Sequence, residues 1–121
     1  MIIVDTSVWV DHFRRPVPKL AEFIAGGSIL LHPFVYGELL LGGLPGKGEA
    51  AHQLLELARA PLASASEAAA FIEWAGLSGT GIGYVDTHLL VAAKLHGDAQ
   101  LLTKDRQLLA QARRLTLACE F

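Results

Sequence analysis

Hydrophobic and polar positions alternate along the chain in short blocks, and these blocks favour strands and helices in turn. Brief apolar runs bounded by Gly, Asp or Ser are typical of buried strands. They predict strands at 2–5 (IIVD), 28–32 (SILLH), 100–103 (QLLT) and 115–118 (LTLA). Each predicted strand is too short to be a helix and carries little polar character, as expected for a sheet that is covered on both faces.

Longer amphipathic segments with helix-boundary residues lie between these runs. Pro18 stands at a first helical position, Gly26 and Gly27 follow a last one, and Ser64 with Glu67 forms a capping box. The predicted helices are Ser7–Phe13, Lys19–Ala25, Phe34–Leu41, Ala50–Ala60, Ala68–Ala75, Tyr84–Leu95 and Lys104–Arg114.

This alternation of strands and helices predicts an α/β fold of three layers, with a short, mostly parallel sheet and helices on both faces. At 121 residues without repeats or a long linker, we expect residues 1–121 to form one domain. Ligands of such sheets bind outside the carboxyl ends of the strands, so the residues that follow each strand are the first candidates for a site.

Composition limits the function classes. Hydrophobic residues make up 52% of the chain, charged residues 18%, and the net charge is −2, which argues against a broadly basic nucleic-acid binder. The apolar excess in AAAFIEWAGL and LLVAAKL predicts a homodimer. The single cysteine, Cys119, fits a reducing compartment, and no segment resembles a signal peptide or a membrane span, so we expect a cytoplasmic protein.

Four carboxylates stand out from the apolar pattern. Asp5 and Asp105 follow strands and Asp86 begins a helix, so each alone is also explained as a helix-terminal acid, with Thr103 as the cap of the last helix. Glu38 differs because its helix, PFVYGELLLGG, is apolar on almost every side. We expect that helix to be buried, and an unpaired buried carboxylate is costly unless a cation accompanies it.

Taken together, the four carboxylates indicate a metal site at the carboxyl edge of the sheet. Clustered carboxylates repel one another unless a cation neutralises them. Oxygen ligands suit Mg²⁺ or Mn²⁺, and such ions support phosphodiester hydrolysis. Zinc is disfavoured, because none of the five histidines forms an HExxH motif or has a cysteine partner.

The segments IIVDTSVWVDHFR, GELLLG, YVDTHLLVAA and LLTKDRQL resemble, in order, the motifs of PIN-domain ribonucleases, in particular the VapC toxins of toxin–antitoxin pairs. The resemblance implies a PIN-like α/β/α domain with four to five strands, and a metal-dependent endoribonuclease inhibited by a cognate VapB-type antitoxin. It implies that Mg²⁺ or Mn²⁺ is held by the four acids Asp5, Glu38, Asp86 and Asp105, and that Thr6 and Thr103 orient these carboxylates by hydrogen bonds. The Gly-rich approach GLSGTGIGYVD departs from the family pattern.

Residues outside the acidic set have less specific roles. Arg14, Arg15, Lys104 and Arg106 are the candidates for contacts with RNA phosphates, because they lie near the expected metal edge. Trp9 and Phe13 are candidate antitoxin contacts, although their i, i+4 spacing on one helical face also predicts inward packing in the core. The alternative function is a catalytically silent PIN-like module that docks a basic partner peptide or RNA.

Overall fold

The computed structural model describes residues 1–42 and 47–121. Strands and helices alternate as the sequence predicts. In chain order the elements are β1 (Ile2–Val4), α1 (Thr6–Arg14), α2 (Pro18–Ala25), β2 (Ile29–Leu31), α3 (Pro33–Leu41), α4 (Lys47–Leu55), β3 (Ala58–Arg59), α5 (Ala65–Ala75), α6 (Tyr84–His96), β4 (Gln100–Leu102) and α7 (Arg106–Arg114).

The sheet has four strands in the order β3-β2-β1-β4, and every pairing is parallel. β1 is central: Ile3 pairs with Leu30 of β2 on one side and with Leu101 of β4 on the other. The expectation of a short, mostly parallel sheet of four to five strands is therefore confirmed.

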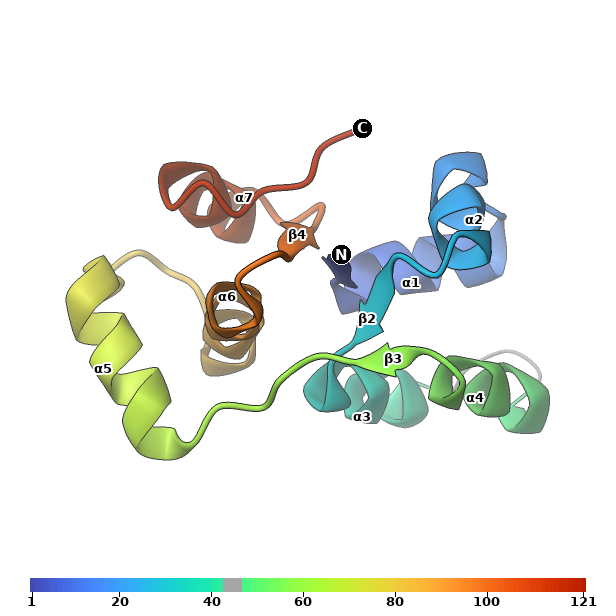
Figure 1. The fold of residues 1–121 in the computed structure, drawn as a ribbon, viewed down its shortest axis with the longest axis horizontal. Coiled ribbons are helices and arrows are strands. Elements are labelled where there is room, and N and C mark those ends of the chain that lie inside the picture. Colours follow the sequence, from blue (N-terminus) through green and yellow to red (C-terminus); the bar gives the residue numbers. More distant parts are fainter. Residues whose placement is uncertain (43–46) are drawn as a thin grey trace.

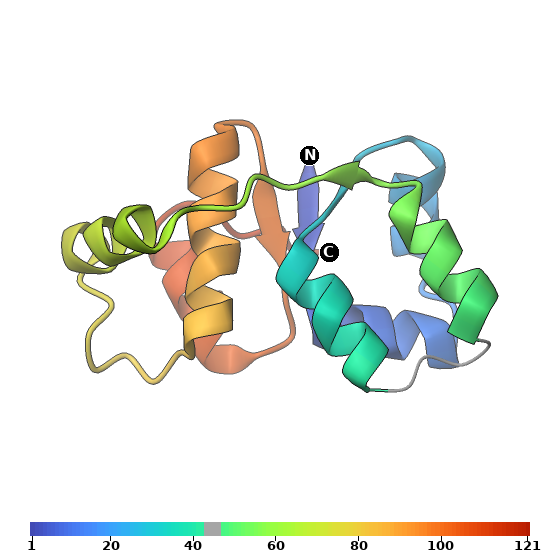
Figure 2. The same cartoon turned by 90° about the horizontal axis from the view of Figure 1, so that it is seen from below.

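Helices cover both faces of this sheet, giving the three layers expected. α1, α2 and α4 lie on one side and α5 and α6 on the other (Figures 1 and 2). α7 runs beside β4 at the edge of the sheet, and α3 leaves the end of β2 to contact α1. Burial of β1 and β2 explains their continuous apolar sequences: all six of their residues are buried.

The core fills the space between the sheet and the helices. Its largest fully buried side chains are those of Trp9, Ile3, Leu20, Ile29, Leu31, Leu39, Leu89, Leu90, Leu101 and Leu108. α6 is the most deeply embedded helix, since seven consecutive residues from Thr87 to Ala93 are buried. That burial holds the middle of α6 in the core, where the helix contacts β4. None of the helices in the described part of the chain has the length and apolarity that crossing a bilayer requires.

Two predicted elements differ from the structure. The helix predicted at 50–60 starts earlier, at Lys47, and ends at Leu55, after which Ala58 and Arg59 form β3 beside Leu30 and Leu31. The strand predicted at 115–118 is reduced to one bridge between Leu101 and Ala118. The capping box is present as predicted: Ser64 accepts from the Glu67 N–H, and Glu67 accepts from the Ser64 N–H.

Candidate functional site

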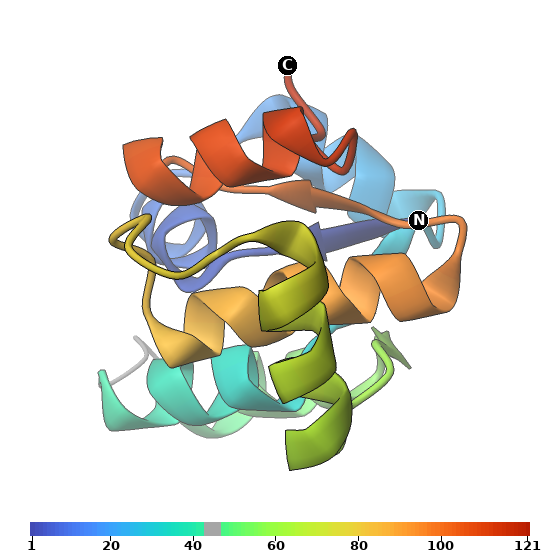
Figure 3. The same cartoon turned by 90° about the vertical axis from the view of Figure 1, so that its left-hand side faces the viewer.

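The four predicted acids come from elements that meet at one edge of the sheet. β1 and β4 point toward the same side of the molecule, and α6 and α7 begin on that side (Figure 3). Asp5 follows β1 as the N-cap of α1, and Asp105 follows β4 as the N-cap of α7. Asp86 lies in the first turn of α6, and Glu38 lies in α3.

Asp5 is buried, with 7% of its surface exposed, and both of its carboxylate oxygens accept hydrogen bonds. Its Oδ1 accepts from the Thr6 N–H at 2.7 Å. Its Oδ2 accepts from the hydroxyl of Thr103 at 2.7 Å and from that of Ser7 at 3.4 Å. Thr103, from the end of β4, thus holds a carboxylate at the end of β1, and the Ser7 contact adds a third donor.

The start of α7 differs from the prediction. Asp105, rather than Thr103, caps the helix, because its Oδ1 accepts from the Leu108 N–H at 2.8 Å. Thr103 instead accepts from the Asp105 N–H at 3.1 Å while donating to Asp5. One threonine hydroxyl therefore connects the two acids that follow the neighbouring strands β1 and β4.

Glu38 lies in different surroundings from those expected. We expected a buried helix, but Glu38 is exposed, and so are Leu40 and Leu41 at 50% and 91%. Only Val35 and Leu39 of α3 are buried, so the helix packs on one face although it is apolar on both. Glu38 is held by a hydrogen bond from the Thr6 hydroxyl to its Oε1 at 2.6 Å. The prediction that Glu38 is buried is therefore wrong, and its position gives no support for a cation on that ground.

Asp86 shows that the acids share one electrostatic environment. The pKa of its carboxyl group is raised from 3.8 to about 6, first by burial and then by the charges of Asp5 and Asp105. The charge of Glu38 adds to the rise, while a hydrogen bond with the Gly83 backbone opposes it. The other three acids thus each act on Asp86 across the folded structure, although they come from three other elements.

The donor set suits a hard divalent cation, because all four side chains offer carboxylate oxygens. Within residues 1–42 and 47–121, however, no three His, Cys, Asp or Glu side chains are grouped tightly enough to form a metal site as they stand. Clustered carboxylates repel one another unless a cation neutralises them. The metal assignment therefore depends on the chemistry of the donors and the coupling to Asp86.

The loop before Asp86 contains several glycines, and one of them lies close to α7. Gly81 has a φ of +87°, which disfavours any side chain, and a Cβ placed there would lie 2.6 Å from Nε2 of Gln107. The glycine therefore lets the approach to α6 pass directly over the first turn of α7. This contact joins the segments that carry Asp86 and Asp105.

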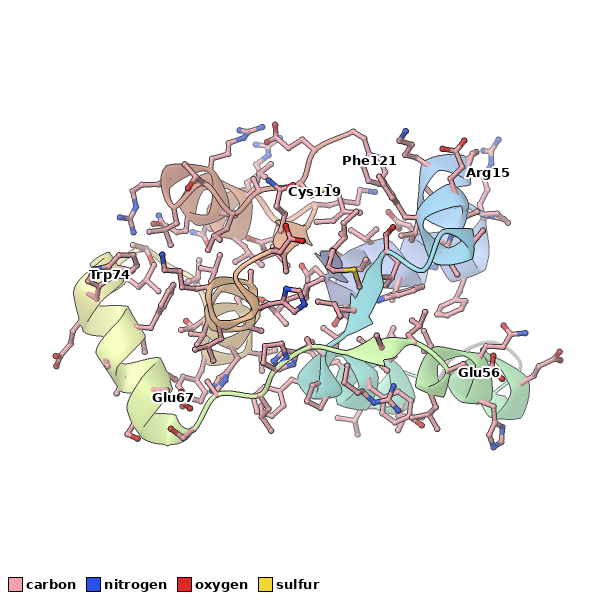
Figure 4. All side chains as sticks on the ribbon, viewed as in Figure 1. Arg15, Glu56, Glu67, Trp74, Cys119 and Phe121 are labelled. Atoms are coloured by element: carbon pink, nitrogen blue, oxygen red, sulfur yellow. The ribbon has the colours of Figure 1, made fainter. Side chains whose placement is uncertain are left out.

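The four basic candidates are all exposed, but they differ in pairing. Lys104 forms an ion pair with Asp11 of α1. Arg14 ends α1, and Arg15 lies at the opposite end of the molecule from Trp74 (Figure 4). None of these placements tests their predicted role in binding RNA.

The two candidate antitoxin contacts lie in a partly buried aromatic pair. Trp9 is 2% exposed and stacks on Phe13, with ring centroids 5.9 Å apart and 20° between the planes. The inward packing left open by the sequence is therefore correct for Trp9. Both rings line a small groove of about 90 Å³ between α1, α2 and α4, which also includes Ile24 and Leu54.

Sequence reasoning overlooked a series of rings between α3 and α6. His32 caps α3 through Nδ1, which accepts from the Phe34 N–H at 3.0 Å, and burial lowers its pKa to about 4. His88 is also buried, with its pKa lowered by burial, and it contacts both Phe34 and Tyr84. The i, i+4 spacing of Tyr84 and His88 was the available signal, since it places both on one face of α6.

Comparison with known proteins agrees with this architecture. The PIN-domain family model matches residues 2–115. Ribonuclease VapC32 of Mycobacterium tuberculosis, from strain H37Rv and from strain CDC 1551 / Oshkosh, is 36% identical over 110 residues, covering 91% of this chain and 89% of the relative. The crystal structure of FitAcB from Neisseria gonorrhoeae has the same fold, with a TM-score of 0.61, 21% identity and coverage of 93% of this chain and 94% of that one. The chain therefore belongs to the PIN-domain family.

Proposed function

We propose that this protein is a metal-dependent endoribonuclease and the toxin of a VapC-type toxin–antitoxin pair. The observation that carries the proposal is the set of acids around Asp86: burial raises the pKa of its carboxyl group most, and the charges of Asp5, Asp105 and Glu38 raise it further. The identity of 36% to a protein named a ribonuclease, over 91% of the chain, supports the same activity.

In this proposal the carboxylates of Asp5, Glu38, Asp86 and Asp105 hold Mg²⁺ or Mn²⁺. The bound ion would supply an activated water and offset the negative charge that develops on the phosphodiester. Thr6 fixes Glu38 through its hydroxyl, and Thr103 fixes Asp5 in the same way. Hydrogen bonds of this kind keep carboxylates oriented for a cation.

We assign the contacts with RNA phosphates to four exposed basic residues, Arg14, Arg15, Lys104 and Arg106. Such contacts orient the strand without reading its sequence. Lys104 has to exchange its ion pair with Asp11 for a phosphate, and this exchange of exposed partners changes the energy little.

The decisive experiment compares RNA cleavage by the wild type with cleavage by Asp86→Asn, in buffer with EDTA and with added Mg²⁺ or Mn²⁺. Glu73→Gln is the matched control, because it removes an exposed carboxylate from α5. We expect cleavage by the wild type and the control only with metal, and none by Asp86→Asn. Wild-type protein that binds RNA or a basic peptide but never cleaves would favour the silent binding module.

We further propose an antitoxin as the inhibitory partner. An arginine of a partner tail could bridge two of the four carboxylates through paired hydrogen bonds and thereby compete with the metal. Phe13, which is only partly buried, and the small groove that it shares with Ile24 and Leu54 offer an apolar anchor for the same tail. Trp9 supports this groove from within rather than offering an exposed face.

A homodimer in the cytoplasm completes the proposal, with residues 1–121 as one PIN domain. Trp74 and Leu95 are 66% and 47% exposed on α5 and α6, the two helices whose apolar excess predicted self-association. They border a shallow groove of about 350 Å³ in which Lys94 lies over the Trp74 ring, with its Nζ 5.1 Å from the ring centroid. Sedimentation velocity at micromolar concentration, with Leu95→Glu as the disrupting variant, tests the dimer.

A further inference from the structure

Four aromatic rings form a continuous series between the start of α3 and the start of α6. The ring centroids of His32 and Phe34 lie 5.2 Å apart, those of Phe34 and His88 4.8 Å, and those of His88 and Tyr84 4.7 Å. The Tyr84 and His88 planes are nearly perpendicular, at 83°. Edge-to-face contacts of this kind are favourable and hold rings in fixed orientations.

The series runs from the core to the surface. His32 and His88 are 1% and 3% exposed, Phe34 is half-buried, and Tyr84 is 55% exposed. The buried nitrogens His32 Nε2 and His88 Nδ1 have no hydrogen-bond partner among the described residues. The buried rings therefore act as packing support, and the ring at the outer end faces solvent on a rigid base.

This outer ring belongs to the same helical turn as a proposed metal ligand. Tyr84 and Asp86 both lie in the first turn of α6, about 3 Å apart along the helix axis but on different sides of the helix, because they are two residues apart. On α3, Phe34 and Glu38 are four residues apart and so occupy one face of that helix. The ring and the carboxylate of α3 thus share one face of the helix, and those of α6 share one helical turn.

We propose that Tyr84, supported by His88 and Phe34, is a stacking platform for an unpaired base of single-stranded RNA beside the phosphate that is cleaved. This inference rests on the proposed ribonuclease function. Bases of single-stranded RNA stack on exposed aromatic rings regardless of their identity, because every base has a π-face. A platform of this kind positions the strand without requiring a particular sequence.

The charge of the protein favours such a contact. The net charge is −2, and the site itself concentrates four carboxylates, which repel phosphates. Stacking supplies attraction that does not depend on positive charge, and it adds to the phosphate contacts assigned to the exposed basic residues.

The test measures binding and cleavage separately. Binding is followed by fluorescence anisotropy of a labelled ten-nucleotide single-stranded RNA of mixed sequence, with Mg²⁺, in an Asp86→Asn background in which cleavage is abolished. The variants are Tyr84→Ala, Tyr84→Leu and Tyr84→Phe. The matched control is Leu62→Ala, since Leu62 is also 55% exposed but lies between β3 and α5. Steady-state cleavage is then measured for the same variants without the Asp86 change.

We expect Tyr84→Ala and Tyr84→Leu to weaken RNA binding roughly 5- to 150-fold, the range that corresponds to removal of a stacking ring. Tyr84→Phe keeps the ring and should bind within about twofold of the parent, as should Leu62→Ala. In cleavage, KM should rise for the first two variants while kcat changes little. Circular dichroism checks that each variant is folded. We expect the Tyr84 variants to fold, because the Tyr84 side chain is exposed.

Two results would refute the stacking platform but leave the proposed ribonuclease function standing. If Tyr84→Leu binds RNA as tightly as the parent, the ring contributes nothing. If Tyr84→Phe loses as much affinity as Tyr84→Ala, the hydroxyl and not the ring makes the contact. Failure of the wild type to cleave RNA with any divalent metal would instead overturn the proposed function, and the platform with it.

Discussion

Asp86→Asn should stabilise the metal-free protein while it abolishes cleavage. The pKa of Asp86 is raised to about 6 by burial and by the neighbouring carboxylates, so its ionised form is disfavoured in the folded state. Asparagine has nearly the same shape and keeps an oxygen for the hydrogen bond with Gly83. The substitution therefore removes an unfavourable charge with little loss of packing.

The size of the stabilisation by Asp86→Asn follows from the change in the pKa of Asp86. It rises from 3.8 to about 6, and a tenfold change in a protonation equilibrium corresponds to about 1.4 kcal/mol. Ionised Asp86 therefore lowers the free energy of unfolding by about 3 kcal/mol at most, and solvent screening of a half-buried group reduces this to about 1–2 kcal/mol.

Proton binding at Asp86 determines whether stability rises or falls with pH. Between about pH 4 and pH 6 the folded state binds more protons at Asp86 than the unfolded chain does, so this group lowers stability as the pH rises. The advantage of Asp86→Asn is then absent below about pH 4, grows up to about pH 6, and is constant above it.

Urea denaturation of the wild type, Asp86→Asn and Glu73→Gln at pH 4 and pH 7.5, in EDTA, measures the effect. Glu73→Gln should match the wild type at both values. Added Mg²⁺ should reverse the order at pH 7.5, because a ligand stabilises the protein that binds it. If Asp86→Asn is no more stable than the wild type at pH 7.5 in EDTA, or gains equally at both pH values, the electrostatic reasoning is wrong.

Asp5→Asn should abolish cleavage and also lower the free energy of unfolding by about 1–2 kcal/mol in the same urea titrations. The reason is that an asparagine side chain has one acceptor oxygen, which cannot accept from both the Thr6 N–H and the Thr103 hydroxyl. Thr6→Val removes the hydrogen bond to Glu38. It should raise the Mg²⁺ concentration needed for half-maximal cleavage by about 10- to 100-fold and change stability by less than about 0.5 kcal/mol. Trp9→Ala should cost about 3–5 kcal/mol in urea denaturation, since Trp9 is only 2% exposed.

Much of the fold could be predicted because its boundaries are marked locally. Pro18 at the start of α2, the Ser64–Glu67 capping box and Gly97 after α6 each fix an element within a few residues of the sequence. β3 has no such local signal. Its two residues are exposed and gain strand structure only by pairing with β2, about 28 positions earlier in the chain.

The environment of the site depended on the same kind of distant contact. The hydroxyl of Thr6 meets a carboxylate 32 residues away, and that of Thr103 meets one 98 residues away. The ordered set of acids could be predicted, but the exposure of Glu38 could not. An apolar helix is buried only where neighbouring elements cover it, and here they cover Val35 and Leu39 but leave Leu41 exposed.

Asp5 lies at the end of β1 and has two interpretations, as a helix cap and as a metal ligand. Its contacts show why the two are compatible. Its Oδ1 caps α1 through the Thr6 N–H, while its Oδ2 is held by the hydroxyl of Thr103 from the neighbouring strand. The contacts that stabilise the start of α1 also fix the direction of the charge. We therefore expect a variant at Asp5 to lower both stability and cleavage. At Asp86 we expect stability to rise while cleavage is lost, so the two effects can be measured separately. Loss of activity with a gain in stability at Asp86 would assign that carboxylate to the site rather than to the scaffold.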